Sequence, residues 1–212
     1  METIKNVVFD LGGVLVPLDL ERCIAAFRSL GMDAVAELIN PCYPAEMLGR
    51  LEHGDITFHE TCDEMRRLSN RPDITDEQIE WAYGEFLNPI PVKLLRQIEA
   101  LRRRGLHTYV LSNNNPASMK FIEEMFRADG HDMEYYFDAV YLSCRMHELK
   151  PSETILRKMI EAGGMIPEET LFIDDGLKNI ETARRLGFAV YMPAPGEDFG
   201  HVLESLAPEK RR

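Results

Sequence analysis

The chain has 212 residues, of which 45% are hydrophobic and 28% charged, and its formal net charge is −12. This composition is close to the globular average, which excludes a disordered or low-complexity chain, and the length fits one domain or one domain with an insertion. The negative charge argues against a nucleic-acid partner, because phosphate backbones repel it, but a phosphate ligand could still be held by a metal ion in a local pocket.

The first apolar stretch, Ile4–Phe9, is short and rich in β-branched residues, which predicts a buried strand. From about Asp19 to Asn88 the pattern changes to three or four helices without a convincing strand, among them Glu21–Leu30 and Asp76–Phe86. We therefore expect a helical insertion of about 70 residues, the size of a small domain.

After the insertion, short apolar runs alternate with amphipathic helical patterns that end at glycines. The predicted strands are Thr108–Leu111, Ala139–Leu142, Leu171–Ile173 and Ala189–Met192, and the predicted helices are Val92–Arg104, Ser152–Ala162 and Leu177–Leu186. Alternation of this kind predicts an α/β fold with an open, doubly wound (Rossmannoid) parallel sheet.

The four cysteines, Cys23, Cys42, Cys62 and Cys144, are scattered and form no Cys-x-x-Cys pair. We interpret them as free thiols of a reducing compartment. No apolar run has membrane-spanning length, and the apolar stretch around Asp10 lacks the basic segment and cleavage site of a signal peptide. The sequence therefore predicts a cytoplasmic protein without a membrane partner.

Polar side chains that could bind a ligand or take part in a reaction stand at the ends of three predicted strands. Asp10 ends the first, Ser112 ends the second, and Asp174 and Asp175 end the fourth. The carboxyl ends of parallel strands meet at one edge of a sheet, where ligands bind. Carboxylates gathered there repel one another unless a cation lies among them, and oxygen ligands suit magnesium. Lys150 adds a positive charge for an anion.

Taken singly, each of these residues has an ordinary structural explanation. An Asp after a strand is often a helix cap, a Ser-Asn pair is often a loop hydrogen-bonder, and a lysine is usually solvated. Their joint placement at one predicted edge favours a functional site.

The segments FDLGGVLV, VLSNN, LKPS and LFIDDG resemble the four motifs of the haloacid dehalogenase (HAD) superfamily, in the same order. The resemblance is strongest to the alpha-D-glucose-1-phosphate phosphatase-like branch and to the phosphatase domain of soluble epoxide hydrolases. It implies a HAD-like core domain over residues 1–16 and 89–212 and a helical cap domain over residues 17–88. It also implies a magnesium-dependent phosphatase that acts on a small phosphorylated metabolite such as a sugar phosphate.

The resemblance carries over site residues position by position. Asp10 matches the nucleophile that forms an aspartyl-phosphate, and Lys150 matches the lysine that neutralises charge on nucleophile and phosphate. Ser112, with Asn113 beside it, matches the hydroxyl that binds the phosphoryl group. The implied Mg²⁺ ligands are the carboxylates of Asp10 and Asp175 and the carbonyl of Gly12, with Asp174 as a weaker ligand or an orienting group. Asn179 could orient a carboxylate from the following helix.

One position departs from the family pattern. Phosphatases of the family usually carry a general acid and base, an Asp, two residues after the nucleophile, where this chain has Gly12. Without it, substrates with good leaving groups, such as sugar 1-phosphates and aryl phosphates, should be favoured unless the cap supplies a proton. Two alternatives stay open: a 2-haloacid dehalogenase-type hydrolase, and a catalytically weak binding protein with the same fold.

The cap offers further candidates for substrate contact. They are the polar residues Tyr43, Glu52, His53 and His59. Of these, His53 or Glu52 could replace the missing acid. The aromatic residues expected in the core of the cap are Phe58, Trp81, Tyr83 and Phe86.

Overall fold

The computed structural model describes residues 4–39 and 46–206. Five parallel strands form one sheet in the order β3-β2-β1-β4-β5. Their bounds are β1 Asn6–Phe9, β2 His107–Ser112, β3 Ala139–Leu142, β4 Thr170–Ile173 and β5 Ala189–Tyr191. The predicted doubly wound α/β sheet is confirmed, and β1 lies at its centre with β2 and β4 on either side.

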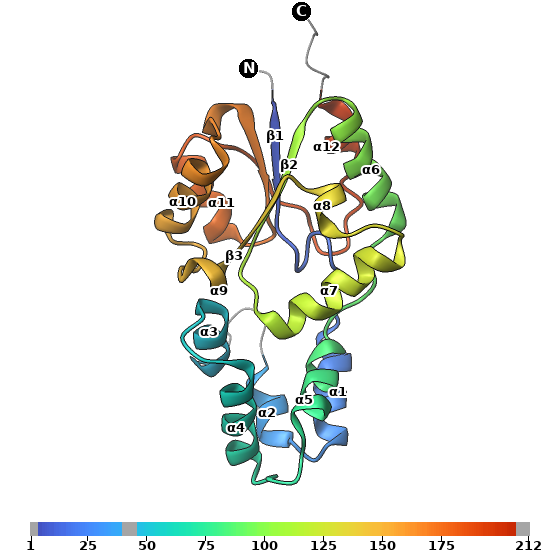
Figure 1. The fold of residues 1–212 in the computed structure, drawn as a ribbon, viewed down its shortest axis with the longest axis vertical. Helices are drawn as coiled ribbons and strands as arrows, with labels where there is room; N and C mark the ends of the chain where they lie inside the picture. The colour runs from blue at the N-terminus through green and yellow to red at the C-terminus, as the bar shows by residue number, and fades with distance from the viewer. Residues whose placement is uncertain (1–3, 40–45, 207–212) are drawn as a thin grey trace, which may run out of the picture.

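Helices cover both faces of the sheet (Figure 1). One layer contains α6 (Val92–Arg103), α7 (Pro116–Ala128), α8 (Met133–Tyr136) and α12 (Gly200–Ser205), and the other contains α10 (Glu153–Gly163) and α11 (Leu177–Arg185). The short helix α9 (Ser143–Met146) follows β3, and a 3₁₀ turn, Pro167–Glu169, precedes β4.

Two hydrophobic clusters result from this layering. Successive side chains of a strand point to opposite faces, so Phe9 packs in one cluster with Leu95 and Phe126. Val8 packs in the other cluster, with Phe172 on β4. Burial on both faces explains why the β1 sequence is continuously apolar before Asp10.

Five further helices lie between β1 and α6, and Figure 1 shows them grouped beyond the carboxyl ends of the strands. They are α1 (Leu20–Ser29), α2 (Asp33–Leu38), α3 (Glu46–His53), α4 (Phe58–Ser69) and α5 (Asp76–Gly84). They enclose a hydrophobic cluster of their own around Phe27, Met32 and Met65. We refer to α1–α5 as the cap and to the sheet with its covering helices as the core.

The two chain segments that join cap and core run side by side. The Asp19 N–H donates to the Phe86 carbonyl, and the Asn88 N–H donates to the Pro17 carbonyl, both at 2.8 Å. Arg22 adds hydrogen bonds to the carbonyls of Glu85 and Leu87 at 2.8 and 2.7 Å. These four hydrogen bonds hold together the two segments through which the chain enters and leaves the cap.

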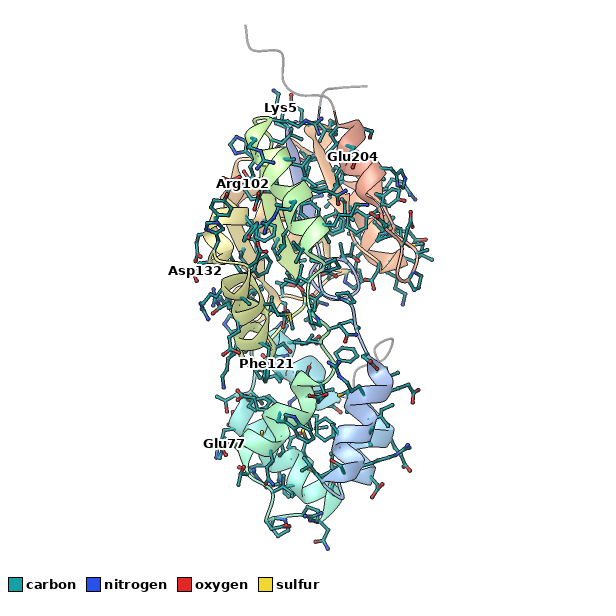
Figure 2. All side chains as sticks on the ribbon, turned by 90° about the vertical axis from the view of Figure 1, so that its right-hand side faces the viewer. Lys5, Glu77, Arg102, Phe121, Asp132 and Glu204 are labelled. Atoms are coloured by element: carbon teal, nitrogen blue, oxygen red, sulfur yellow. The ribbon has the colours of Figure 1, made fainter. Side chains whose placement is uncertain are left out.

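Cap and core also approach closely at α5 and α7. Figure 2 shows Phe121 of α7 at the level where the two parts meet. A Cβ atom at Gly84, the last residue of α5, would stand 2.7 Å from the Phe121 ring carbon Cζ, closer than packed carbon atoms can lie. A larger residue at position 84 would therefore force the Phe121 ring to shift.

Several helices differ from the sequence-based expectation. The described part of the cap has five helices where three or four were expected, since α2 and α3, with six and eight residues, are too short for a clear periodicity. The helix α7 was not predicted. Trp81, expected in the cap core, is 47% exposed, because α5 presents it outward while Ile79 and Ala82 face inward; that expectation was wrong.

Candidate functional site

A buried cluster of charges lies at the carboxyl edge of the sheet. It consists of Asp10 and Asp174, which follow β1 and β4, and of Lys150, which follows α9. The Lys150 ammonium lies 2.8 Å from Asp10 Oδ2 and 2.6 Å from Asp174 Oδ2. The Lys150 side chain is 2% exposed and that of Asp174 is fully buried. We call Asp10, Lys150 and Asp174 the buried trio.

The backbone around Asp10 continues the sheet and then turns away. The Asp10 N–H donates to the Ile173 carbonyl of β4 at 2.9 Å, which extends the ladder by one residue. The Leu11 N–H donates to Asp10 Oδ1 at 2.7 Å. One carboxylate oxygen is thus fixed by the turn, and the other faces Lys150.

Asn113 positions Lys150. Its Oδ1 accepts from the Lys150 N–H at 2.8 Å, and its Nδ2 donates to the Lys150 carbonyl at 3.0 Å. Both polar atoms of this amide are therefore engaged with the Lys150 backbone, which gives Asn113 a positioning role. Ser112, at the end of β2, is buried and lines the same cavity.

Asp174 is enclosed by donors. Its Oδ1 accepts from the Gly176 N–H and from Asn179 Nδ2, both at 2.8 Å, while its Oδ2 accepts from Lys150. Asn179 thus orients a carboxylate, as its position in the following helix suggested. With both oxygens occupied, Asp174 fits an orienting role better than that of a metal ligand.

The electrostatics follow from burial and from the mutual proximity of the charges. Burial raises the pKa of Asp10 to about 7, and the negative charges of Asp174 and Asp175 act in the same direction against the opposing Lys150. Burial alone would lower the pKa of Lys150, but Asp10 and Asp174 raise it above its ordinary value, so the lysine stays charged. Burial, followed by the charge of Asp174, also raises the pKa of Asp175.

This edge of the sheet fits a divalent cation. Carboxylate oxygens of Asp10, Asp174 and Asp175 lie within 4.8 Å of one another, and the Lys150 ammonium pairs with two of these three carboxylates, those of Asp10 and Asp174. Gly13 has φ +74°, and a Cβ atom there would stand 2.0 Å from Asp175 Oδ2. The turn of Gly12 and Gly13 therefore lies directly against the exposed Asp175 carboxylate. A hard, oxygen-rich and negatively charged site of this kind suits Mg²⁺.

A second group with metal-ligating side chains, His53, Asp55 and His147, lies at the surface between cap and core. His53 Nδ1 and Asp55 Oδ1 of this group are hydrogen-bonded to each other at 2.8 Å, which explains why these two side chains lie close together.

The buried trio opens into a cavity of about 430 Å³ between core and cap. The core contributes Asp10, Gly12, Ser112, Lys150 and Asp175 among other residues, and the cap contributes mainly apolar side chains such as Leu48. Two polar residues of the described cap also line this wall: Glu52 at the end of α3 and Tyr83 of α5. Tyr83 and Phe86, expected in the cap core, line the cavity as well as packing against that core.

The remaining polar candidates of the cap lie elsewhere. His53 turns to Asp55, and His59 bonds to Asp76 Oδ2 at 2.6 Å through its Nδ1. Neither lines the cavity. Tyr43 and Cys42 lie outside the described residues, and the other three cysteines are free.

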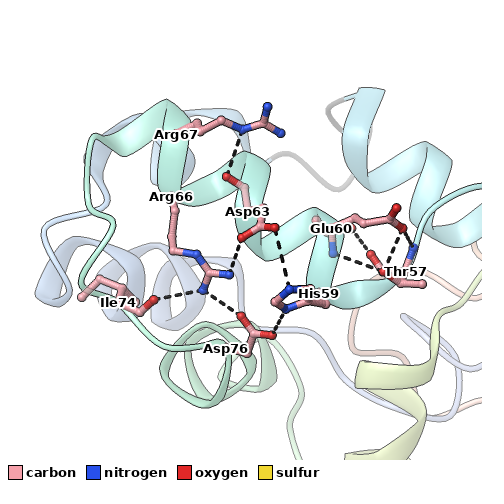
Figure 3. Close-up of polar contacts among 9 residues, drawn as sticks. Thr57, His59, Glu60, Asp63, Arg66, Arg67, Ile74 and Asp76 are labelled. Atoms are coloured by element: carbon pink, nitrogen blue, oxygen red, sulfur yellow. Dashed lines mark hydrogen bonds and ion pairs between the residues drawn. The ribbon is translucent and has the colours of Figure 1, made fainter.

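His59 belongs to an exposed charge network that joins α4 to the start of α5 (Figure 3). Arg66 contacts Asp63 Oδ1 and Asp76 Oδ1, each at 2.7 Å, and donates to the Ile74 carbonyl at 3.0 Å. We call His59, Asp63, Arg66 and Asp76 the cap network. Its contacts hold two cap helices together at a distance from the cavity lining.

Two positioning residues were not anticipated from the sequence. Asn115 caps α7 by accepting from the N–H groups of Ala117 and Ser118, and its Nδ2 donates to the Tyr83 hydroxyl at 3.3 Å. Ser143, fully buried at the start of α9, donates to the Glu52 carbonyl at 2.5 Å. The Asn-Pro pair at 115–116 is a recognisable helix start, whereas nothing local signals the contact of Ser143.

The chain matches the family model for haloacid dehalogenase-like hydrolases over residues 4–187. It belongs to this family. The resemblance seen in the four motifs is thereby confirmed. Within the described ranges, none of the helices is long and apolar enough to cross a membrane.

Individual relatives agree with this assignment. D-ribitol-5-phosphate phosphatase of Bacteroides thetaiotaomicron is 34% identical over 201 residues, which cover 94% of this chain and 97% of the relative. A HAD family enzyme of the same organism, solved as a complex with magnesium and inorganic phosphate, superposes with a TM-score of 0.88 at 36% identity and covers 94% of this chain and 98% of its own. Mouse bifunctional epoxide hydrolase 2 is 23% identical over 89% of this chain and 36% of its own length.

Proposed function

We propose that this HAD-family hydrolase is a magnesium-dependent phosphatase that cleaves a small phosphorylated polyol or sugar through an aspartyl-phosphate on Asp10. The observation that carries the proposal is the Lys150 ammonium between Asp10 and Asp174, beside Asp175, in a cavity closed by the cap. Three carboxylates and one lysine at the edge of a parallel sheet form a site for a cation and a phosphate together.

Each residue has a separate part in this reaction. Asp10 Oδ attacks phosphorus, and Lys150 balances the charge that nucleophile and phosphate bring together. Ser112 donates a hydrogen bond to a phosphoryl oxygen. Asn113 and Asp174 hold Lys150 in place through the contacts described above.

Asp10, Asp175 and the Gly12 carbonyl are the groups that would hold Mg²⁺. The ion, when bound, neutralises phosphate charge and removes its repulsion from the nucleophile. Phosphoryl transfer depends mainly on such positioning and charge balance. Glycine at position 13 allows the turn to approach Asp175, which brings this set of oxygens together.

The cavity supports a small substrate. Its volume of about 430 Å³ and its enclosure between two parts of the molecule fit a metabolite rather than a polymer. The relative from Bacteroides thetaiotaomicron is named for its action on D-ribitol 5-phosphate, the phosphate ester of a five-carbon polyol. We propose a substrate of this class, with the phosphate at the buried trio and the hydroxyl chain toward the cap.

A haloacid substrate fits the site less well. The nucleophile Asp10 and its neighbours Asp174 and Asp175 already bring three carboxylates together, and a haloacid would add a fourth negative charge beside one lysine. Chloride release from haloacetate in the presence of EDTA would support that alternative. Phosphoryl transfer to Asp10 would exclude a purely binding role.

The free thiols of Cys23, Cys62 and Cys144 support a reducing compartment, and we propose that the enzyme works in the cytoplasm. The net charge of −12 repels the phosphate backbone of a nucleic acid. A small anion can still bind where a cation holds it.

The test is phosphate release from a panel of sugar and polyol phosphates, with Mg²⁺ and with EDTA. We expect Mg²⁺-dependent release from at least one small ester and none from the Asp10→Asn variant. Hydroxylamine trapping followed by peptide mass spectrometry should locate the phosphoryl group on Asp10. Release that persists in Asp10→Asn would overturn the proposal.

A further inference from the structure

Among the described core residues that line the cavity, the titratable ones are Asp10, Lys150 and Asp175, which lie at the phosphate end and leave the departing oxygen without a donor. Gly12 occupies the position that could carry one, and the turn that contains it faces Leu18, whose Cδ1 would lie 3.5 Å from an added Cβ. A primary alcohol such as the 5-hydroxyl of a pentitol is a weak acid, so its ester needs protonation as it leaves. The donor must come from another part of the cavity wall.

Few titratable side chains line this wall among the residues that the structure describes. They are Asp10, Cys23, Glu52, Tyr83, Lys150 and Asp175. Asp10, Lys150 and Asp175 are engaged at the phosphate end of the cavity. Burial raises the pKa of Cys23 to about 12, and burial with the neighbouring charge of Glu52 raises the pKa of Tyr83 above its ordinary value. Both are poor donors near neutral pH, which leaves Glu52.

The location of Glu52 matches the direction of the reaction. The nucleophile and the leaving oxygen lie on opposite sides of phosphorus in an in-line displacement. Asp10 approaches from the edge of the sheet, so the leaving oxygen must point away from the sheet, toward the cap. Glu52, at the end of α3, is the carboxyl group in the cap wall of the cavity.

The core fixes the backbone of Glu52. Ser143 Oγ donates to the Glu52 carbonyl at 2.5 Å and accepts from the Asn114 N–H at 3.0 Å, so one buried hydroxyl joins the cap to the end of β2. A Cβ atom at Gly54 would stand 2.4 Å from the Cys144 carbonyl oxygen, which shows how closely the turn after α3 lies against α9. His53, the neighbouring candidate, bonds to Asp55 outside the cavity.

We propose that Glu52 is the general acid that protonates the leaving oxygen and the general base that then activates water; this inference rests on the phosphatase function proposed above. As Asp10 Oδ bonds to phosphorus, the bond to the leaving oxygen breaks, and that oxygen keeps the electron pair and takes the Glu52 proton. In the second step the Glu52 carboxylate takes a proton from water while the water oxygen bonds to phosphorus. The bond to Asp10 then breaks, and both side chains return to their initial states.

The protonation state of Glu52 supports this role. Burial and the negative charge of Asp10 raise its pKa to about 7, with Lys150 acting in the opposite direction. A group that titrates near neutral pH can donate a proton in one step and accept one in the next.

The experiment compares Glu52→Gln with the wild type on two esters of different leaving-group acidity. With an alkyl phosphate such as ribitol 5-phosphate, we expect kcat/KM to fall about 10²–10³-fold, the size of a general-acid contribution. With para-nitrophenyl phosphate, whose leaving group needs no proton, we expect a fall below about tenfold. The value of kcat/KM reports the steps up to phosphorylation of Asp10, so it isolates the acid role.

The matched control is Glu37→Gln, the same change at an exposed position on α2, which should leave both values unaltered. Glu52→Asp keeps an acid and should retain the wild-type ratio of the two activities better than Glu52→Gln, which tests the inference even if the amide variant folds poorly. Equal losses on both esters in Glu52→Gln would overturn the acid role. A wild-type enzyme without activity on any phosphate ester would instead refute the proposed function.

Discussion

The buried trio and the cap network both consist of cations paired with carboxylates, yet the carboxylates of the cap network are far more exposed to water. The carboxylates that pair with Lys150 are 11% and 0% exposed, whereas Asp63 and Asp76, which pair with Arg66, are 52% and 32% exposed. Charges withdrawn from water perturb one another strongly, as the raised pKa of Asp10 shows. Exposed charges are screened and contribute little. Burial, more than residue type, therefore separates a reactive cluster from one that joins helices.

The largest effect is expected from the buried trio. Lys150→Ala should lower kcat/KM about 10²–10³-fold, because it removes a fixed charge that stabilises the transition state. Lys158→Ala is the control, since Lys158 is exposed and its ammonium bonds to a main-chain oxygen, the Met146 carbonyl, at 2.9 Å. Steady-state kinetics of both variants checks the comparison, and equal losses would remove the distinction between the two kinds of site.

The next effect concerns the cation. Asp175→Asn should weaken Mg²⁺ binding at least about tenfold, since altering even the outer partners of metal sites commonly costs 10–100-fold. Calorimetric titration measures the affinity, and circular dichroism checks that the fold is intact. Asp198→Asn, a change at an exposed residue paired with Lys93, should leave the affinity as it is. An unaltered affinity in Asp175→Asn would contradict the assignment of this ligand.

A smaller effect is expected where an acid is returned to the core. The nearest atom to a Cβ at Gly12 would be Leu18 Cδ1 at 3.5 Å, an ordinary contact, so an aspartate begins without a clash. When Gly12→Asp is added to the Glu52→Gln variant, kcat/KM on an alkyl phosphate should rise about tenfold above that of Glu52→Gln alone. This is a part of the usual contribution of a general acid. Gly12→Asn in the same background has nearly the same size without the acid and should restore nothing. If both variants act alike, the effect of the aspartate is steric.

The smallest effect belongs to the cap network. Arg66→Ala should lower the free energy of unfolding by about 1 kcal/mol or less, as exposed pairs do, and leave kcat/KM within about twofold of the wild type. Urea denaturation gives the first value. Arg67→Ala serves as the control, because Arg67 Nε makes one long bond of 3.3 Å to the Asp63 carbonyl. A large loss of activity in Arg66→Ala would show that the cap network acts on the cavity after all.

The sequence predicted the core of the site better than its cap. Asp10, Ser112 and Asp174 could be placed together because each lies at or just after the end of a parallel strand, and the geometry of a sheet brings strand ends to one edge. No comparable rule relates a cap helix to that edge. Glu52 and His53 were therefore equivalent candidates in the sequence, and only the packing of α3 against α9 separates them.

Other differences also arise from tertiary contacts. Asn113, expected to bind substrate, lines the cavity, and the sequence did not indicate that its side-chain amide bonds to the Lys150 backbone, 37 residues away. Trp81 was expected inside the cap, but α5 buries Ile79 and Ala82 and turns Trp81 to the exposed side of the helix. Local pattern predicts which element a residue belongs to more reliably than what its side chain touches.

The pairing of the central strands has a consequence for how the protein can be recovered from a denaturant. Phe9 pairs with Val110 on β2 and with Ile173 on β4, and the side chains on β1 alternate between the two faces. A slip of β1 by one residue would turn Asp10 to the opposite face and away from Lys150, while leaving a compact chain with nearly the same helix content. Refolded material should therefore be judged by two yields. The recovered far-ultraviolet ellipticity measures how much secondary structure has re-formed. The recovered phosphatase activity measures the fraction of chains in which the strands have aligned correctly.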